Sequence, residues 1–120
     1  MEQDERYLES LKRLLGKEVT VKVDRALGSA HPKYPDLIYP INYGYIESMI
    51  APDGDPQDAY ILGVAEAVDS LCGVVLAIIV RRNDVESKLI VAPKGMSFSD
   101  EEILAAVDFQ ERYFDSYLLR

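Results

Sequence analysis

The chain has 120 residues, of which 48% are hydrophobic and 28% charged, and its net charge is −8 at pH 7. This length suits one core and is short for two, so we expect a single domain over residues 1–120. The net negative charge disfavours nucleic acid and anionic membrane surfaces as partners. No apolar run approaches the ~20 residues of a membrane span. Residues 1–6 lack the apolar core of a secretory signal, so the cytoplasm is the expected location.

The first third of the chain predicts a helix, a strand and a long loop. Apolar residues recur at helical spacing over residues 4–15, and Gly16 stands where a left-handed residue would end that helix. Residues 19–24 alternate with period two and are rich in β-branched side chains, which predicts a strand. Residues 26–42 carry one glycine and three prolines, which predicts an ordered loop with a brief strand at 37–39. Loops of this length are often functional.

The rest of the chain is mainly β and closes with a helix. Further strands are predicted at 43–49, 59–64, 73–81 and 88–91, the last two forming a hairpin. Ser99 and Glu102 form a capping box, which predicts a helix of four to five turns that includes Phe114 and Leu118. The predicted class is therefore α+β, mainly β, with an antiparallel barrel or curled sheet and a helix at each chain end.

The single cysteine, Cys72, lies beside Gly73 in an apolar stretch. It can form no disulfide within the chain, and no second cysteine or nearby histidine supports a zinc site. We therefore expect a buried structural thiol.

Acidic chemistry is concentrated in Asp53-Gly54-Asp55-Pro56-Gln57-Asp58, on a turn between two predicted strands. Three carboxylates this close need a cation or solvent to stay ionised together. If Asp53 and Asp58 bind Mg²⁺, Asp55 between them can accept a proton from the water that the metal activates. The spacing does not fit an EF-hand, whose loop needs glycine at position six and glutamate at position twelve. From these six residues alone, a solvated acidic turn remains the alternative.

The segment Tyr-Pro-Ile-Asn-Tyr-Gly-Tyr-Ile at 39–46, followed by the acidic run at 53–58, resembles the signature region of the soluble family I inorganic pyrophosphatases. The acidic run matches that family's Asp-x-Asp-Pro-x-Asp pattern. Residues 88–93 resemble the strand that carries the family's lysine after a second acidic cluster, and residues 109–114 resemble its aromatic helix. The resemblance implies a five-stranded OB-like barrel with an N-terminal and a C-terminal helix. It also implies an inorganic diphosphatase that hydrolyses pyrophosphate to two phosphates with Mg²⁺, or with Mn²⁺ in its place.

The resemblance also implies roles for the residues of the signature region and of the second acidic cluster. Asp55 would be the base or orienter of the attacking water, and Tyr43 would hydrogen-bond to that water or to a phosphate oxygen. The implied metal ligands are Asp53, Asp58, Glu86 and Asp84. The implied substrate contacts are Lys88, Tyr113 and Lys33, and Asp24 lies where a family carboxylate follows the first strand.

Two phosphate-binding cations of the family pattern are missing. Phe114 stands where the family has a lysine, and the loop over 28–39 is too short to include the segment that normally brings an arginine onto the substrate. Each such contact typically contributes ~1.5–3 kcal/mol, so their loss lowers the affinity for pyrophosphate or suits another substrate. The candidate replacements are Arg25, which we also assign to substrate binding, His31, Arg81 and Arg82.

Three hypotheses follow from the sequence. The first is a pyrophosphatase that binds a small phosphate substrate and, by analogy with bacterial family members, forms a homo-oligomer. The second is a hydrolase of another phosphoanhydride, such as a nucleotide or an organic diphosphate. The third is a barrel that binds metal or a phosphorylated effector without turnover. The three carboxylates at 53, 55 and 58 disfavour the third hypothesis, whereas Phe114 favours it.

Overall fold

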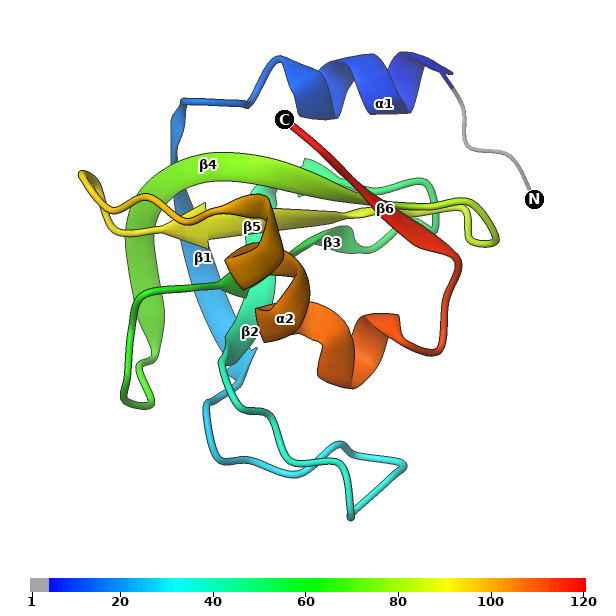
Figure 1. The fold of residues 1–120 in the computed structure, drawn as a ribbon. Helices are drawn as coiled ribbons and strands as arrows, with labels where there is room; N and C mark the ends of the chain where they lie inside the picture. The colour runs from blue at the N-terminus through cyan, green and yellow to red at the C-terminus, as the bar shows by residue number, and fades with distance from the viewer. Residues whose placement is uncertain (1–4) are drawn as a thin grey trace.

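A computed structural model describes residues 5–120, whose strands pair into a closed barrel flanked by two helices (Figure 1). The elements are α1 (Glu5–Lys12), β1 (Glu18–Arg25), β2 (Asn42–Ile50), β3 (Pro56–Ile61), β4 (Ser70–Arg81), β5 (Lys88–Ala92), α2 (Asp100–Glu111) and β6 (Ser116–Leu119). None of the helices in residues 5–120 is long and apolar enough to cross a membrane.

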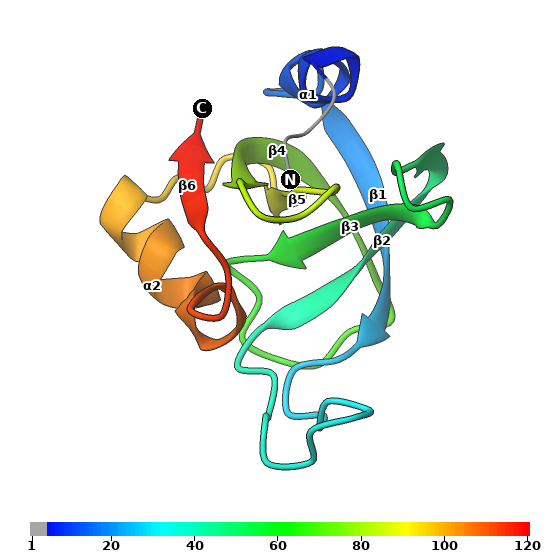
Figure 2. The ribbon, with the colours of Figure 1, turned by 90° about the vertical axis from the view of Figure 1, so that its right-hand side faces the viewer.

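Five strands close the barrel in the order β1, β2, β3, β5 and β4, and β4 returns to pair with β1. The β3–β5 pair is parallel, and the other pairs are antiparallel. Strand β6 lies outside the barrel and pairs with the last residues of β4. Figure 2 shows α2 and β6 together on one side of the barrel, with the loop between β1 and β2 at its lower end.

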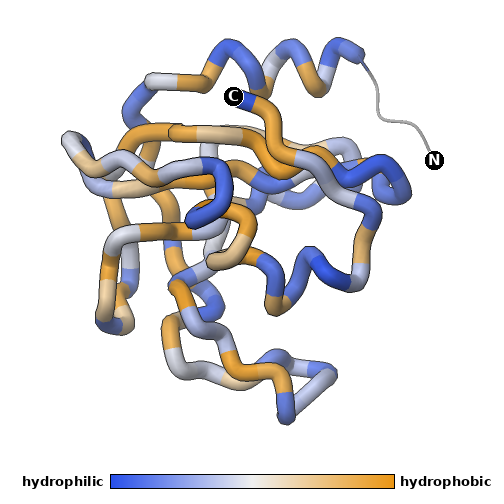
Figure 3. Tube along the Cα trace, in the orientation of Figure 1, coloured by the Kyte–Doolittle hydropathy of each residue, from blue (hydrophilic) through white to orange (hydrophobic). Residues whose placement is uncertain are grey.

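The closed barrel packs two hydrophobic clusters because successive strand residues point to opposite faces. Ile78 belongs to the cluster that α1 joins through Tyr7 and Leu11. The next residue, Ile79, belongs to the cluster that α2 joins through Ile103. Figure 3 shows hydrophobic residues along the strands and mixed polarity along both helices. The barrel therefore positions α2 firmly, and with it the residues at the C-terminal end of that helix.

Strands β1 and β2 approach each other very closely at Gly44. A Cβ atom built at Gly44 would lie 1.9 Å from the carbonyl oxygen of Lys22. A β-bulge follows on β1 between Val23 and Arg25. The bulge bends the strand and changes where the side chain of Arg25 points.

The barrel, the two helices and the β4–β5 hairpin confirm the predicted fold class. The barrel is mixed rather than antiparallel as predicted, because β3 and β5 are parallel. Gly16 adopts φ +80° after α1, and Ser99 and Glu102 form the predicted capping box. The helix predicted from residue 4 is observed over Glu5–Lys12, and residue 4 itself lies outside the described residues. The predicted strand at 37–39 reduces to an isolated bridge between Ala30 and Ile38.

Two further predictions are wrong. Helix α2 ends at Glu111, and residues 116–119 form β6, so neither Phe114 nor Leu118 is helical. The backbone edge of β4 provides hydrogen-bond partners there, and this tertiary pairing overrides the helical spacing of the apolar residues. Cys72 is exposed rather than buried, because it lies near the start of β4 opposite Thr20, on the outward face of the strand.

Candidate active site

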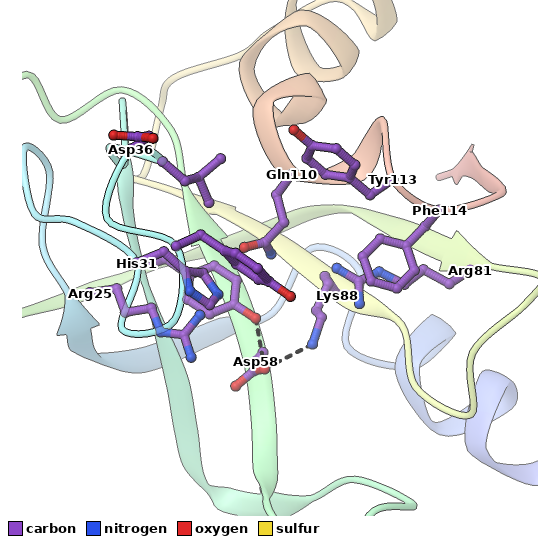
Figure 4. Close-up of a pocket in the computed structure, with 12 residues that line it drawn as sticks. Arg25, His31, Asp36, Asp58, Arg81, Lys88, Gln110, Tyr113 and Phe114 are labelled. Atoms are coloured by element: carbon purple, nitrogen blue, oxygen red, sulfur yellow. Dashed lines mark hydrogen bonds and ion pairs between the residues drawn. The ribbon is translucent and has the colours of Figure 1, made fainter.

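A cleft of about 830 Å³ opens between the β1–β2 loop, the barrel strands and the C-terminal end of α2. Its lining residues are Arg25, His31, Tyr34, Asp36, Leu37, Tyr43, Asp58, Arg81, Lys88, Gln110, Tyr113 and Phe114. Figure 4 shows Arg25 and His31 on one side, Tyr113 and Phe114 on the other, and Asp58 and Lys88 between them. The cleft thus combines a charged centre with aromatic walls.

Three predicted residues meet at the centre of the cleft. Tyr43 Oη donates to Asp58 Oδ2 at 2.7 Å, and Lys88 Nζ contacts the same oxygen at 2.8 Å. On the paired strands β2 and β3, Tyr45 lies opposite Asp58, so Tyr43 is a diagonal neighbour on the same face. Lys88 begins β5, which runs beside β3. Burial, and then the charge of Asp58, raise the pKa of Tyr43 well above its usual value, so its hydroxyl remains a donor.

Two further carboxyl groups contact this centre. Lys88 also forms an ion pair with Glu86, which is buried. Burial raises the pKa of Glu86, contact with Asp53 raises it further, and Lys88 opposes both effects. The same contact lowers the pKa of Asp53. Because Glu86 is buried and Asp53 is exposed, Glu86 is the more easily protonated of these two carboxyl groups.

The chemistry of this cluster fits a divalent cation. Carboxylate oxygens are the ligands that Mg²⁺ prefers, and the buried oxygen Oε2 of Glu86 has no hydrogen-bond partner within residues 5–120. In the same part of the chain, however, no three acidic, histidine or cysteine side chains are grouped closely enough to hold a metal ion. The ammonium of Lys88 lies between Asp58 and Glu86. A cation bound by all of these carboxylates would therefore compete with Lys88 for position.

Besides Asp53 and Glu86, three more of the predicted site residues do not line the cleft. Asp55 is exposed on the turn before β3, where its backbone N–H donates to Asp53 Oδ1 at 3.0 Å. Asp84 pairs with Arg81 at 3.1 Å, and its Oδ1 accepts from the backbone N–H of Glu86 at 3.4 Å. Lys33 is also exposed. The catalytic, metal and substrate roles of these three residues stay predictions.

Arg25 and Tyr113, which we predicted to contact substrate, do line the cleft. Arg25 Nη1 donates to Tyr39 Oη at 2.6 Å, and its guanidinium lies 5.6 Å from the centre of the Tyr43 ring. Tyr113 follows α2 and is 69% exposed. Arg25 thus brings a positive charge to the side of the cleft that the shortened loop leaves without an arginine of its own.

Glu111, at the C-terminal end of α2, organises the other side of the cleft. Its two carboxylate oxygens accept from Arg81 Nε at 3.1 Å and Arg81 Nη2 at 2.7 Å. They also accept from Tyr60 Oη at 2.5 Å and Ser116 Oγ at 2.6 Å. The guanidinium of Arg81 lies 3.6 Å from the centre of the Phe114 ring. The phenylalanine that replaces the family lysine therefore supports an arginine in the cleft wall.

A chain of hydrogen bonds continues from this hub across α2 to Arg25. Gln110 Nε2 donates to Tyr60 Oη at 2.8 Å, and Tyr39 Oη donates to Gln110 Oε1 at 3.0 Å. Because Arg25 donates to Tyr39, the two arginines of the cleft are held by one continuous network. Apart from the two arginines, its members were missed as site residues, although Gln110 and Glu111 lie in the segment that resembles the family's aromatic helix.

The family model for inorganic pyrophosphatase matches residues 6–116. An inorganic pyrophosphatase of Saccharolobus solfataricus is 44% identical over 46 residues, which are 38% of this chain and 23% of that protein. One of Caulobacter vibrioides is 35% identical over 83 residues, which are 69% of this chain and 38% of that protein. The matched stretches thus span less than half the length of these curated relatives.

The solved structure of an inorganic pyrophosphatase from Coxiella burnetii has the same fold, with a TM-score of 0.61 at 18% identity. The similarity covers 87% of this chain and 84% of the other. Because the family model spans nearly the whole chain and the barrel matches as well, this chain belongs to the inorganic pyrophosphatase family.

Proposed function

We propose that this chain hydrolyses inorganic pyrophosphate to two phosphates in the cleft described above, with Mg²⁺ as the divalent cation. The observation that carries the proposal is a cluster in which Asp58 contacts both Tyr43 and Lys88 at the cleft lining, while Lys88 also pairs with the buried Glu86. Membership of the family supports the same reaction and a requirement for a divalent metal.

A cation is needed because two positive charges of the cleft, those of Lys88 and Arg81, are already compensated. Lys88 is paired with Asp58 and Glu86, and Arg81 is paired with Glu111 and Asp84. Pyrophosphate is a polyanion, and the chain carries a net charge of −8, so the protein alone attracts it weakly. When bound, Mg²⁺ neutralises phosphate oxygens and lowers the pKa of the attacking water. Asp53, Asp58 and Glu86 would hold it.

Side chains of the cleft and of the turn before β3 supply the remaining functions. A water oxygen attacks one phosphorus, the bond from that phosphorus to the bridging oxygen breaks, and two phosphates leave. Asp55 accepts the proton of that water. Lys88 and Arg25 place positive charge near phosphate oxygens, and Tyr43 donates a hydrogen bond there.

The test is phosphate release from pyrophosphate with Mg²⁺ for the native chain and for Asp55→Asn. Removal of a general base typically lowers a rate ~10²–10⁴-fold. Asp69→Asn, at an exposed position before β4, is the matched control and should keep the native rate. Native release no faster than background, with Mg²⁺ binding intact, would reject the proposal in favour of a non-catalytic phosphate-binding barrel, and native release equal to that of Asp55→Asn but above background would reject Asp55 as the base.

Two expectations about the whole protein accompany this proposal. We expect a homo-oligomer, and the 43% exposed Leu104 on α2 offers a site for contact between copies. Light scattering behind a sizing column would give the mass, and a monomeric mass at micromolar concentration would contradict the expectation. The cytoplasm remains the predicted location.

A further inference from the structure

One wall of the cleft is a ladder of aromatic rings that extends outward from the core. The buried ring of Tyr39 lies 6.2 Å from His31, with an interplanar angle of 11°. The His31 ring lies 5.0 Å from that of Tyr34, which is 64% exposed. His31 Nδ1 accepts from the backbone N–H of Lys33 at 3.0 Å, which fixes the loop around the ring. We call this wall the aromatic platform: the rings of Tyr39, His31 and Tyr34 contact one another in series, and the ring of Tyr34 is exposed at its outer end.

The platform is also uncharged at neutral pH. Burial lowers the pKa of His31, and the charges of Arg25 and Lys33 lower it further. A neutral imidazole beside Tyr34 presents a continuous apolar and aromatic surface, which suits a flat heterocycle. Leu37 belongs to the same loop and also lines the cleft.

The opposite side repeats this chemistry. Tyr113 is 69% exposed beside the cleft, and the ring of Phe114 packs against the guanidinium of Arg81. Figure 4 shows Tyr113 and Phe114 across the cleft from His31. Aromatic side chains therefore flank the charged centre from both sides.

Pyrophosphate gives these walls nothing to bind, because it has no apolar surface. A cleft of about 830 Å³ falls in the range of ~300–1,000 Å³ that encloses drug-sized organic ligands, which apolar walls and a few polar groups typically recognise. The paired charges of Lys88 and Arg81 also favour a ligand that gains binding energy from stacking as well as from its phosphates.

We propose that the cleft takes a nucleoside diphosphate, whose base stacks on Tyr34 while its diphosphate lies at Tyr43 and Lys88. Asp36 lines the same wall and offers a carboxylate to the sugar hydroxyls. The inference rests on the proposed function because the same cluster cleaves the bond. Water attacks the β-phosphorus, the bond to the bridging oxygen breaks, and the products are a nucleoside monophosphate and phosphate.

Binding of two non-hydrolysable probes to the full chain with Mg²⁺ tests nucleotide recognition independently of catalysis. Calorimetry compares α,β-methylene-ADP with methylenediphosphonate, which has the same diphosphate core without the nucleoside. Stacking on an aromatic side chain predicts a preference of at least about five-fold for the nucleoside probe. Tyr34→Ala should remove this preference and Tyr34→Phe should retain it. Ile38→Ala is the matched control, since Ile38 is an exposed residue of the same loop that does not line the cleft.

Equal affinities for the two probes, no binding of either probe, or a preference that survives in Tyr34→Ala would overturn the inference. Phosphate release from pyrophosphate and from ADP is measured separately. Pyrophosphate cleavage with equal probe affinities rejects the nucleotide inference and leaves the proposed function standing. A preference that requires Tyr34, with no release from pyrophosphate, supports the inference and rejects pyrophosphate as the substrate.

Discussion

The buried ion pair between Arg81 and Glu111 gives the sharpest stability prediction. Glu111→Gln keeps the shape of the side chain but removes its charge, and its amide N–H₂ faces donors on Arg81, Tyr60 and Ser116. Both charged side chains are nearly inaccessible, with exposures of 5% and 6%. Removal of one partner of a buried pair typically costs ~3–5 kcal/mol because the other charge remains buried. Domains of this size have a total stability of about 5–15 kcal/mol, so the loss is large.

Urea unfolding followed by far-UV circular dichroism measures this loss, because the chain has no tryptophan to report by fluorescence. Asp108→Asn is the matched control, since Asp108 pairs with Arg112 on the exposed surface of the same helix. Such an exposed pair contributes only ~0.3–0.5 kcal/mol. A Glu111→Gln variant no less stable than Asp108→Asn would refute the assignment of Glu111 as the hub of the network.

Three more predictions concern pH, packing and catalysis. Burial raises the pKa of Glu111, but its bonds with Arg81 outweigh burial and leave the pKa below its usual value. The stability of the native protein should therefore fall as the pH drops below about 4. In acid titrations of the unfolding free energy, Glu111→Gln should lack this loss. Gly44→Ala should unfold the β1–β2 pair or fail to express as folded protein, because its Cβ would meet the Lys22 carbonyl oxygen; a native melting temperature would contradict this close approach. Tyr43→Phe should lower kcat/KM for pyrophosphate about 10–100-fold through loss of one charge-assisted hydrogen bond. Tyr45→Phe, on the same strand, is the control and should leave kcat/KM unchanged. Equal values for the two variants would exclude a role for the Tyr43 hydroxyl.

The barrel could be predicted because its signals are local. Period-two alternation in β1 and the turn at 51–56 depend on residues close together in the sequence. Strand β6 could not be predicted in this way, since Leu118 continues the helical spacing of the preceding apolar residues and the segment becomes a strand only because β4 offers a free edge. Cys72 was wrongly assigned to the core for a related reason. The residues around Cys72 are apolar on both faces of β4, so the sequence does not show which face Cys72 occupies. The register of β4 with β1 determines that face.

The centre of the site was accessible from sequence because Tyr43, Asp58 and Lys88 belong to motifs. The network around Glu111 was not, because a glutamate on a predicted helix is ordinarily a solvated residue. Its burial depends on Arg81, which precedes it by 30 residues and lies on another element. The aromatic platform was missed for a similar reason. His31 stacks on Tyr39 and contacts Tyr34 only when the loop folds back onto Tyr39.

The most direct measurement is the initial rate of phosphate release from pyrophosphate by the native chain and by Asp58→Asn, at increasing Mg²⁺ concentration. Asp58 contacts both Tyr43 and Lys88, so it is the residue on which the cluster converges. A pyrophosphatase built on this cluster should show release that rises with Mg²⁺ and falls at least about 100-fold in Asp58→Asn at every concentration. Native release that is independent of Mg²⁺, or equal to that of Asp58→Asn, would contradict a reaction centred on these carboxylates.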